Sequence, residues 1–287
     1  MLLEQAFIKF VLKYLQSCTN FFLLSFCNPA AVFRSPSFSL IGRNKPKIDL
    51  LSDRSIKGDL MEAFVGTSGW YYDWNKKKNL DWFIQNSGLN SVELNASYYR
   101  FPSPEQIEGW NSKGTGLRWS IKVHRSITHW RQLSESSLET LGNFLELFQP
   151  MDHLIDFYLF QVPPKFDDVE RALRFAEAAK LGKRFALEIR NKALLGNDEA
   201  CEELTRKVTL VSVDSPDYKN HIFPGKNVYM RMHGREDWYS YDYSQAEISE
   251  TIREIYEFGP EKTYIYFNND HNMLDNARKA LRVFSGL

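Results

Sequence analysis

Four short apolar stretches of the chain end in polar or ionisable side chains that are two residues apart. These pairs are Glu93 with Asn95, Lys122 with His124, Glu188 with Arg190, and Arg231 with His233. Residues i and i+2 of a β-strand point to the same face, so each pair is expected on one side of its strand. Charges on the inner side of a closed sheet are costly unless they pair with each other or bind a ligand. The pattern therefore predicts an internal ion-pair network or a ligand site, and four contributing strands favour the ligand site.

The residue types in these pairs indicate acid–base chemistry on a small polar ligand that is anionic or contains a sugar. Glu93 and Glu188 are the candidate general acid and base, and His233 is the candidate for assisting proton transfer. Lys122 and Arg231 are the candidates for holding an anion. A desolvated Lys122 could instead act as a Schiff-base amine, but the sequence indicates no electrophilic substrate, so anion binding is favoured. Hydrolysis or isomerisation fits better than redox work because no cofactor motif is present.

Metal-assisted chemistry is an alternative for the same end of the sheet. Hard oxygen and nitrogen donors that suit magnesium, manganese or zinc follow four different stretches: Glu93, Glu188, Asp214 and His233. No short motif such as H-E-x-x-H supports such a site. We therefore assign no metal ligand and leave the cofactor unknown, with a divalent metal and a metal-dependent phosphoesterase as open alternatives.

Aromatic residues crowd the segments after the same stretches, among them Tyr71, Tyr98, Trp238 and Tyr239. Such a rim could stack on sugar rings or on nucleobases. A nucleic-acid-binding or repair module is the second hypothesis, with phosphate contacts from Lys122, Arg125, Arg131 and Arg235. The charge counts against it: residues 1–60 hold eight basic and four acidic residues, which leaves 28 basic and 32 acidic of the 36 of each kind for residues 61–287. A catalytically inert scaffold is the third hypothesis, but it leaves the inward charges unexplained.

The elements that must position these residues alternate between strands and helices. Strands are expected at about 63–67, 90–94, 117–123, 154–162, 184–190, 208–213, 227–232 and 263–268, and helical periodicity covers 134–148, 168–181 and 244–258. This alternation predicts an α/β fold with a parallel sheet, and eight units fit a single (β/α)8 TIM-like barrel, which gathers the carboxyl ends of its strands at one mouth. An open doubly wound sheet is the alternative, but Gly66-Thr67-Ser68-Gly69 lacks a dinucleotide or P-loop spacing.

Residues 1–60 differ in composition from the remainder. An uncharged segment over 14–33 precedes a Ser/Pro/Lys/Arg-rich segment over 34–58. We expect a poorly structured N-terminal extension over 1–60, favouring a misassigned start ahead of Met61 over a targeting leader or a membrane anchor, and a barrel over 61–287. With only Cys201 beyond residue 60, no disulfide framework is expected, so a cytoplasmic protein with no membrane segment in 61–287 is predicted.

Seven ordered blocks between about residues 63 and 285 resemble the YecE-like family, also called domain of unknown function 72. The blocks are Gly66–Trp70, Val92–Asn95 followed by Tyr98-Tyr99 and Pro102, Lys122 with Ile127–His129, Gln161–Pro164, Glu188–Arg190, Arg231–Gly234, and Phe267–Asn269. The resemblance implies a TIM-barrel-like fold whose one end is lined by these blocks, and it implies no settled activity. The strand ends and the aromatic rim add ligand-binding candidates to Lys122 and Arg231, namely Asn95, Arg190, Asn268, Asn269, Trp70, Tyr99 and Gln161. The segment Asn191–Leu195 and the pair Asp270-His271 depart from the family pattern, so roles of those positions in relatives do not carry over.

Overall fold

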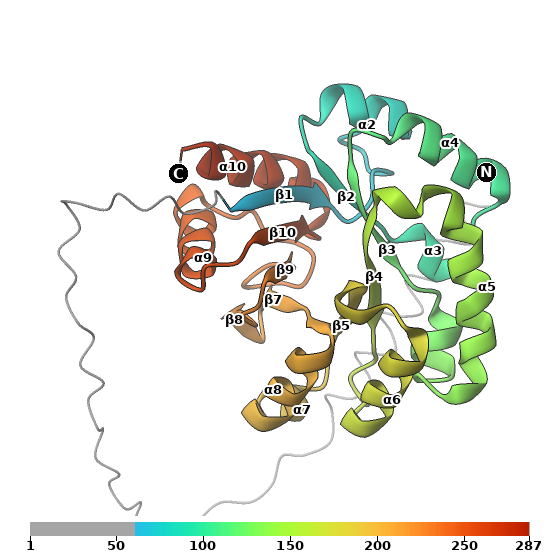
Figure 1. Cartoon of the computed structure of the whole chain (residues 1–287). Helices are drawn as coiled ribbons and strands as arrows, with labels where there is room; N and C mark the ends of the chain where they lie inside the picture. Colours follow the sequence, from blue (N-terminus) through green and yellow to red (C-terminus); the bar gives the residue numbers. More distant parts are fainter. Residues whose placement is uncertain (1–60, 287) are drawn as a thin grey trace, which may run out of the picture. The chain divides into compact units, whose positions relative to one another are not determined.

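The computed structural model describes residues 61–286. The extension expected over residues 1–60 lies outside the described residues. Within the described part, a curled β-sheet carries helices along its outer side (Figure 1). The predicted α/β class with a mostly parallel, TIM-barrel-like sheet is confirmed.

Ten strands form the sheet, in the order β6-β5-β4-β3-β2-β1-β10-β9-β7-β8. Their bounds are β1 (Glu62–Thr67), β2 (Ser91–Leu94), β3 (Arg118–Lys122), β4 (Ile155–Gln161), β5 (Phe185–Glu188), β6 (Thr209–Leu210), β7 (Ser212–Ser215), β8 (Tyr218–His221), β9 (Asn227–Met232) and β10 (Lys262–Phe267). All neighbours are parallel except β7 and β8, which are antiparallel. Near-continuous apolar runs are typical of parallel strands covered on both faces, which is why the sequence pattern located eight of them.

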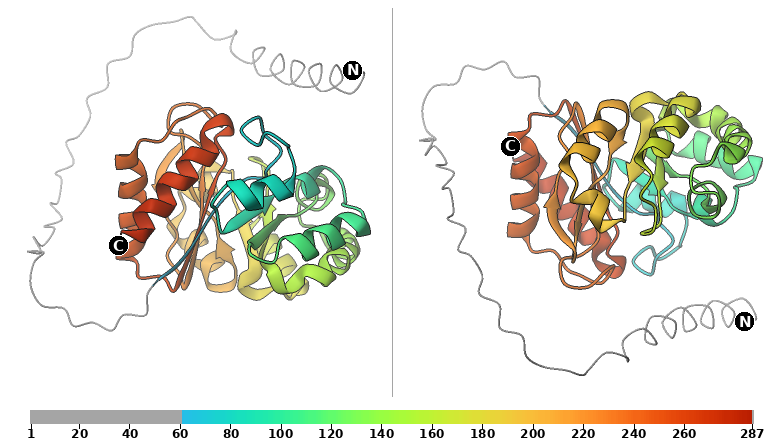
Figure 2. Two further views of the ribbon diagram at one scale, coloured as in Figure 1. Left: turned by 90° about the horizontal axis from the view of Figure 1, so that it is seen from above. Right: turned by 90° about the horizontal axis from the view of Figure 1, so that it is seen from below.

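The helices follow the strands along the chain. They are α2 (Leu80–Asn86), α3 (Ala96–Tyr99), α4 (Pro104–Lys113), α5 (Leu138–Phe148), α6 (Val169–Ala179), α7 (Lys192–Leu195), α8 (Asp198–Lys207), α9 (Gln245–Glu257) and α10 (Met273–Ser285). Local sequence sets their starts: the Ser103 side chain accepts a hydrogen bond from Gln106 N before α4, and Ser244 accepts one from Glu247 N before α9. Figure 2 shows α9 and α10, in orange and red, side by side against one part of the sheet. None of the helices within residues 61–286 is long and apolar enough to cross a membrane.

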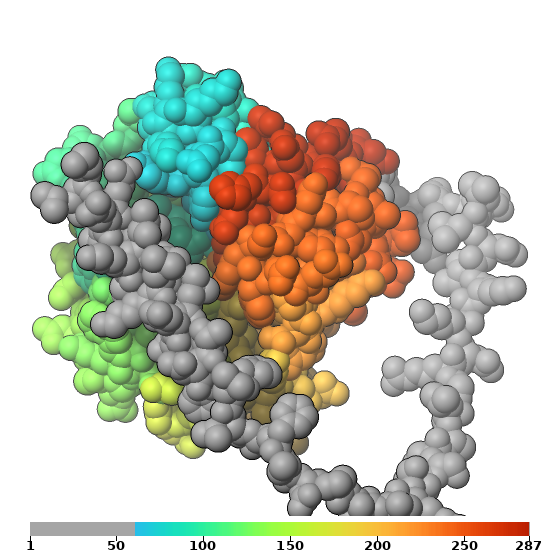
Figure 3. Space-filling view, turned by 180° about the vertical axis from the view of Figure 1, so that it is seen from behind, coloured from blue at the N-terminus to red at the C-terminus, as the bar shows by residue number. Residues whose placement is uncertain are grey.

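The sheet curls because one continuous chain segment, residues 209–214, pairs with a different strand at each of its ends. Thr209 and Leu210 pair with β5, whereas Ser212–Asp214 pair with β9, and only Val211 separates β6 from β7. At the other side β1 pairs with β10, so the first described strand lies beside the last (Figure 1). On the surface, residues from the beginning of the described part, in cyan, lie next to residues from its end, in red (Figure 3).

The predicted eightfold strand–helix repeat is incomplete in the structure. No helix lies between β7 and β9; the chain instead turns back as β8, with Val213 paired to His221. The connection 216–226 is shorter than the dozen or so residues that a helical crossover needs, which explains the difference.

Two hydrophobic clusters hold the fold together. The larger one packs the outer face of the sheet against the helices. The smaller one consists of sheet residues from the other face, among them Phe64, Phe157, Tyr229 and Tyr266. The side chains of Glu93 and Arg231 have the same strand parity as these aromatic residues, so the polar cluster begins where the inner apolar cluster ends.

Candidate functional site

The buried ionisable side chains gather at the carboxyl ends of the parallel strands. Glu93, Glu188, Arg231 and His233 are all 0% exposed and come from the ends of β2, β5 and β9. Lys122 at the end of β3 and Arg190 after β5 are partly exposed. The structure therefore brings together the residues that the sequence placed in the four pairs, apart from His124, which bonds to Ser126 instead.

Arg231 is the centre of the cluster and first binds Glu93 in a two-point contact. Its Nε lies 2.9 Å from Glu93 Oε2, and its Nη2 lies 2.6 Å from Oε1. The Tyr229 hydroxyl donates to Oε2 at 2.6 Å, while Ser68 and Asn95 donate to Oε1 at 2.8 and 3.0 Å. Burial alone would raise the pKa of Glu93, but the charge and hydrogen bonds of Arg231 outweigh it and hold this pKa below its ordinary value. Glu93 is therefore ionised at neutral pH.

The second carboxylate, Glu188, lies between two arginines. Arg231 Nη1 lies 2.5 Å from Oε2, Arg190 Nη2 lies 2.5 Å from Oε1, and Gln161 Nε2 donates to Oε1 at 3.0 Å. Burial opposes ionisation, yet the charges of Arg190 and Arg231 hold the pKa of Glu188 well below its ordinary value. Both carboxylates thus serve as counter-ions that keep two guanidinium groups in place.

His233 is a neutral imidazole inside this cluster. Its Nε2 lies 3.1 Å from Arg190 Nη2 and 3.5 Å from Glu188 Oε1, and its Nδ1 lies 3.3 Å from Asn268 Nδ2. Burial and the charge of Arg190 lower the pKa of His233 to about 3. Because a guanidinium group can only donate, Nε2 is the acceptor in the contact with Arg190.

Lys122 differs from the arginines in having no carboxylate partner of its own. Its Nζ lies 4.6 Å from the centre of the Tyr98 ring, and it makes no hydrogen bond or ion pair with any residue in 61–286. Burial and the charge of Arg231 lower the pKa of Lys122 to about 7, against the opposing attraction of Glu188 and Glu93. Among these groups, Lys122 is the one whose charge changes near neutral pH.

A histidine and an aromatic ring border Lys122. The His129 ring packs edge-on against Tyr98 with 5.1 Å between ring centres. Burial, followed by the charge of Lys122, lowers the pKa of His129 to about 4, so this imidazole is also neutral near pH 7.

An open pocket of about 500 Å³ lies next to the cluster. Its lining residues are Pro164, Arg190, Lys192, Asp217, Trp238 and Tyr239. The Arg190 guanidinium lies over the Trp238 ring at 4.6 Å, and its Nε is buried without a hydrogen-bond acceptor in residues 61–286. Arg190 therefore links the pocket to Glu188 and His233.

Of three other predicted ligand-binding residues, Trp70 and Asn269 pack elsewhere and Tyr99 lies at the rim of the cluster. Trp70 packs edge-on against Trp110 and Trp119, with ring centres 5.9 and 5.8 Å apart. Asn269 donates to the Tyr241 carbonyl and to Asn276 Oδ1, which ties the chain after β10 to α10. Tyr99 is 63% exposed and packs against Tyr98 at the rim. Asn95, Gln161 and Asn268 do join the cluster through the contacts given above.

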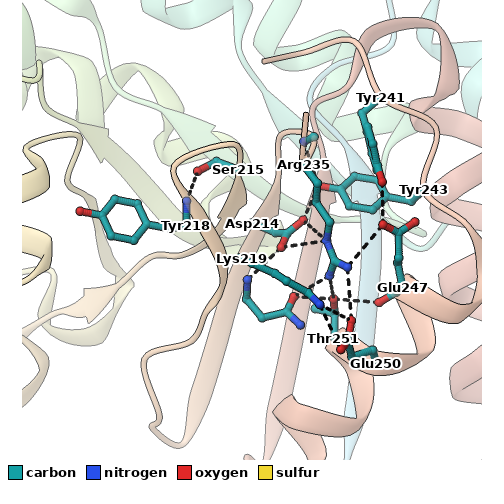
Figure 4. Close-up of polar contacts among 12 residues, drawn as sticks. Asp214, Ser215, Tyr218, Lys219, Arg235, Tyr241, Tyr243, Glu247, Glu250 and Thr251 are labelled. Carbon is teal, nitrogen blue, oxygen red and sulfur yellow. Dashed lines mark hydrogen bonds and ion pairs between the residues drawn. The ribbon is translucent and has the colours of Figure 1, made fainter. Parts of the chain in front are cut away.

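Asp214, one of the four proposed metal ligands, belongs to a separate polar network (Figure 4). Its Oδ2 accepts hydrogen bonds from Tyr243 at 2.7 Å and from Arg235 at 3.0 Å. In residues 61–286 no three His, Cys, Asp or Glu side chains lie where they could share a metal ion. Arginines pair with Glu93, Glu188 and Asp214, the three carboxylates among the candidate donors of that alternative.

Two of the four residues proposed to contact phosphates are already engaged. Arg235 pairs with Asp214, Glu247 and Glu250. Arg131 donates to the Ser136 carbonyl and to Thr140. Arg125 lies over the exposed Trp130 ring at 5.1 Å.

The residue that sequence reasoning missed is Tyr229. It lies inside β9, two residues before Arg231, and its hydroxyl makes a 2.6 Å contact to Glu93. The alternation that grouped Arg231 with His233 also places Tyr229 on that face, so the signal was present.

Comparisons with known proteins give a family and a fold. The family model described as protein of unknown function DUF72 matches residues 64–285. A DUF72 family protein of Thermotoga maritima is 25% identical, with a TM-score of 0.66 over 78% of this chain and 99% of that one. A DUF72 family protein of Enterococcus faecalis is 21% identical, with a TM-score of 0.65 over 78% of this chain and 95% of that one. Among curated proteins none matches this sequence.

Proposed function

Because the chain belongs to the DUF72 family, whose function is unknown, we propose a function from its own geometry. The protein is an enzyme that binds a small polar ligand with an anionic group at the carboxyl ends of the strands. Proton transfer of the hydrolase or isomerase type takes place there. The observation that carries this proposal is the excess of cations over carboxylates in one buried cluster.

The charge balance favours an anion as the ligand. Arg231, Arg190 and Lys122 face only Glu93 and Glu188, and all four carboxylate oxygens already accept hydrogen bonds. Buried charges that lack a partner are costly, so an anion beside Arg190 and Lys122 stabilises the site. The exposed Tyr99 and Tyr239 at the rim supply flat apolar surfaces that suit a sugar ring.

Proton transfer is best assigned to Lys122. General acid–base groups work best when their pKa lies near the operating pH, and the pKa of Lys122 is lowered to about 7. Glu93 and Glu188 remain candidates from the sequence, but their lowered pKa values suit the role of counter-ions to Arg231. His233, with a pKa of about 3, accepts a hydrogen bond and orients Arg190.

We also propose that the sheet acts as a closed barrel of eight parallel strands. The pairing of residues 209–210 with β5 and of residues 212–214 with β9 supports closure. A closed barrel directs every strand end towards one mouth, where such folds perform their chemistry. We place the protein in the cytoplasm, a proposal supported by Cys201, which is a free, buried thiol.

Titration calorimetry of the full chain with inorganic phosphate, glycerol 3-phosphate and glucuronate tests the anion site. We expect binding that weakens with added salt, and Arg190→Gln should lower the affinity at least about tenfold, since a hydrogen bond to a charged group contributes about 1.5–3 kcal/mol. Arg174→Gln, on the outer face of α6 and paired with Glu170, is the matched control and should bind as the unchanged chain does. Absence of binding, or equal losses in both variants, would refute the proposal.

A further inference from the structure

Lys122 has the surroundings of an amine that reacts with a carbonyl group. It ends a strand at the mouth of the sheet, is partly exposed, and rests on the Tyr98 ring at 4.6 Å. The arginines take the carboxylates nearby, so within residues 61–286 no acceptor holds the ammonium form by a direct hydrogen bond. An amine in this position keeps its lone pair available once it loses its proton.

The neighbouring cations favour the neutral amine. Arg231 and Arg190 both disfavour a third positive charge, and burial acts in the same direction. Desolvation and an adjacent cation are the two conditions that activate a lysine as a nucleophile. Near neutral pH a substantial fraction of Lys122 is therefore unprotonated.

We propose that Lys122 forms a Schiff base with an aldehyde or ketone substrate whose anionic group is held beside Arg190. This inference rests on the proposed function, because it names the substrate class of the same site. It adds a covalent step that anion binding and simple acid–base transfer do not require.

Imine formation at Lys122 consumes one proton and releases one water molecule. The neutral Lys122 nitrogen attacks the carbonyl carbon, a C–N bond forms as the C–O π bond breaks, and one proton passes from the nitrogen to the oxygen. The resulting carbinolamine loses its hydroxyl group, with a second proton, as one water molecule. Amine, carbonyl compound and one proton thus give a protonated imine and water, without any oxidant or reductant.

The cluster has groups for both ends of such a substrate. Arg190 lies between the pocket and Glu188, with Nε directed to no acceptor in residues 61–286, and can pair with a carboxylate or phosphate group. His129 lies against the same Tyr98 ring as Lys122 and is a neutral imidazole, so it borders the amine without adding another positive charge. A proton on the imine nitrogen then makes the adjacent carbon acidic, which suits isomerisation or carbon–carbon bond cleavage.

Reductive trapping tests the proposal on the full chain. The protein is incubated with glyoxylate, pyruvate or dihydroxyacetone phosphate in the presence of sodium cyanoborohydride, and the modified residue is located by peptide mass spectrometry. We expect one adduct per chain with at least one of these compounds, located on Lys122 and absent from Lys122→Arg. Lactate and glycerol 3-phosphate, which lack the carbonyl group, should give none.

Lys183→Arg is the matched control variant. Lys183 is an exposed lysine that also has a lowered pKa, but its amine donates to the Thr205 and Val208 carbonyls at the end of α8, away from the carboxyl ends of the strands. This variant should keep the adduct in full. Labelling spread over exposed lysines, or equal in Lys122→Arg, would overturn the proposal.

The proposed function and the Schiff base can fail separately. Calorimetric binding of the carbonyl compounds without any adduct would overturn the Schiff base and leave the anion site intact. Neither binding nor an adduct with any compound would count against both.

Discussion

At the residue scale, Arg231 unites the cluster because it binds two carboxylates at once. It contacts Glu93 through two nitrogens and Glu188 through a third, and all three side chains are fully buried. Replacing such a set with apolar residues is often harmless, but removing one partner leaves a buried charge without compensation. Replacing any one of these three residues should therefore destabilise the fold, whether or not a ligand binds.

Glu93→Gln should lower the free energy of unfolding by about 3–5 kcal/mol, because Arg231 then keeps a buried positive charge with half of its partners. Urea unfolding of the full chain measures this. Asp81→Asn, which removes an exposed pair with Lys113, should change stability by less than about 1 kcal/mol. Equal effects of the two substitutions would show that Arg231 does not depend on Glu93.

Lys122 should make the free energy of unfolding depend on pH near and above neutrality. Its folded pKa of about 7 is below the ordinary value of 10.5, so between these two pH values the unfolded chain binds the proton and the folded chain does not. The free energy of unfolding should therefore rise with pH over this interval relative to Lys122→Met. Glu93 and Glu188 are ionised throughout, and the pKa of His129 at about 4 lies outside the interval. Parallel pH profiles of the two proteins would contradict the shifted pKa.

Glu93 and Glu188 should make the free energy of unfolding depend on pH in the acidic range. The folded pKa values of Glu93 and Glu188 are depressed, so their contribution is present above the ordinary value of 4.5 and is lost as the pH falls through the folded values. Acid unfolding of Glu188→Gln should accordingly show a weaker pH dependence below pH 4.5 than that of the unchanged chain. Identical acid slopes would argue that Glu188 is not held ionised by Arg190 and Arg231.

At the scale of elements, the segment after β9 brings the pocket wall to the cluster. Gly234 has φ of 109°, and a Cβ atom there would lie 2.4 Å from the Asp237 carbonyl oxygen, so the turn requires glycine. Arg235 then anchors the segment through Asp214 on β7 and Glu250 on α9 (Figure 4). Trp238, which lies under Arg190, follows directly in this anchored segment.

Asp214→Asn should loosen this segment and weaken ligand binding without touching the ligand. Hydrogen exchange of residues 234–244 should become faster, and the affinity for the anion that binds best should fall. Glu250→Gln is the control, because Glu250 is 40% exposed and is one of several partners of Arg235. Unchanged exchange and affinity in Asp214→Asn would show that the network is not what positions Trp238.

Most helices and parallel strands were predictable from the sequence, whereas the antiparallel strand β8 was not. Buried parallel strands such as β4 and amphipathic helices such as α5 and α9 leave periodic patterns that a single sequence displays. Strand β8 has no such pattern: its four residues are mostly half-exposed and its pairing depends on the turn at Pro216–Asp217. The alternating parity also located the charged cluster. It could not reveal that Trp70 packs on Trp110 or that Asn269 bonds to Asn276 of α10, because those contacts depend on the tertiary arrangement.

At the scale of the whole molecule, the two ends of the sheet differ in how their charges are used. The opposite end of the sheet has a pocket of about 370 Å³. Its lining includes three basic residues, Lys183, Arg184 and Lys262, and two acidic residues, Asp156 and Glu261. Arg184 pairs with Asp152 and Lys262 with Glu62, so these two cations are partly exposed and individually neutralised. At the carboxyl end Arg231 is buried, Lys122 and Arg190 are partly buried, and these three cations outnumber the two carboxylates, which is the basis of the proposed anion site.

The most direct test is a crystal structure of the full chain soaked in selenate, with the anion located by its anomalous scattering. The account predicts a selenate ion beside Arg190 and within reach of Lys122, at the carboxyl ends of β3 and β5. Selenate only at the opposite end, near Lys183 and Lys262, or no ordered selenate at all, would contradict the claim that this cluster is an anion-binding site.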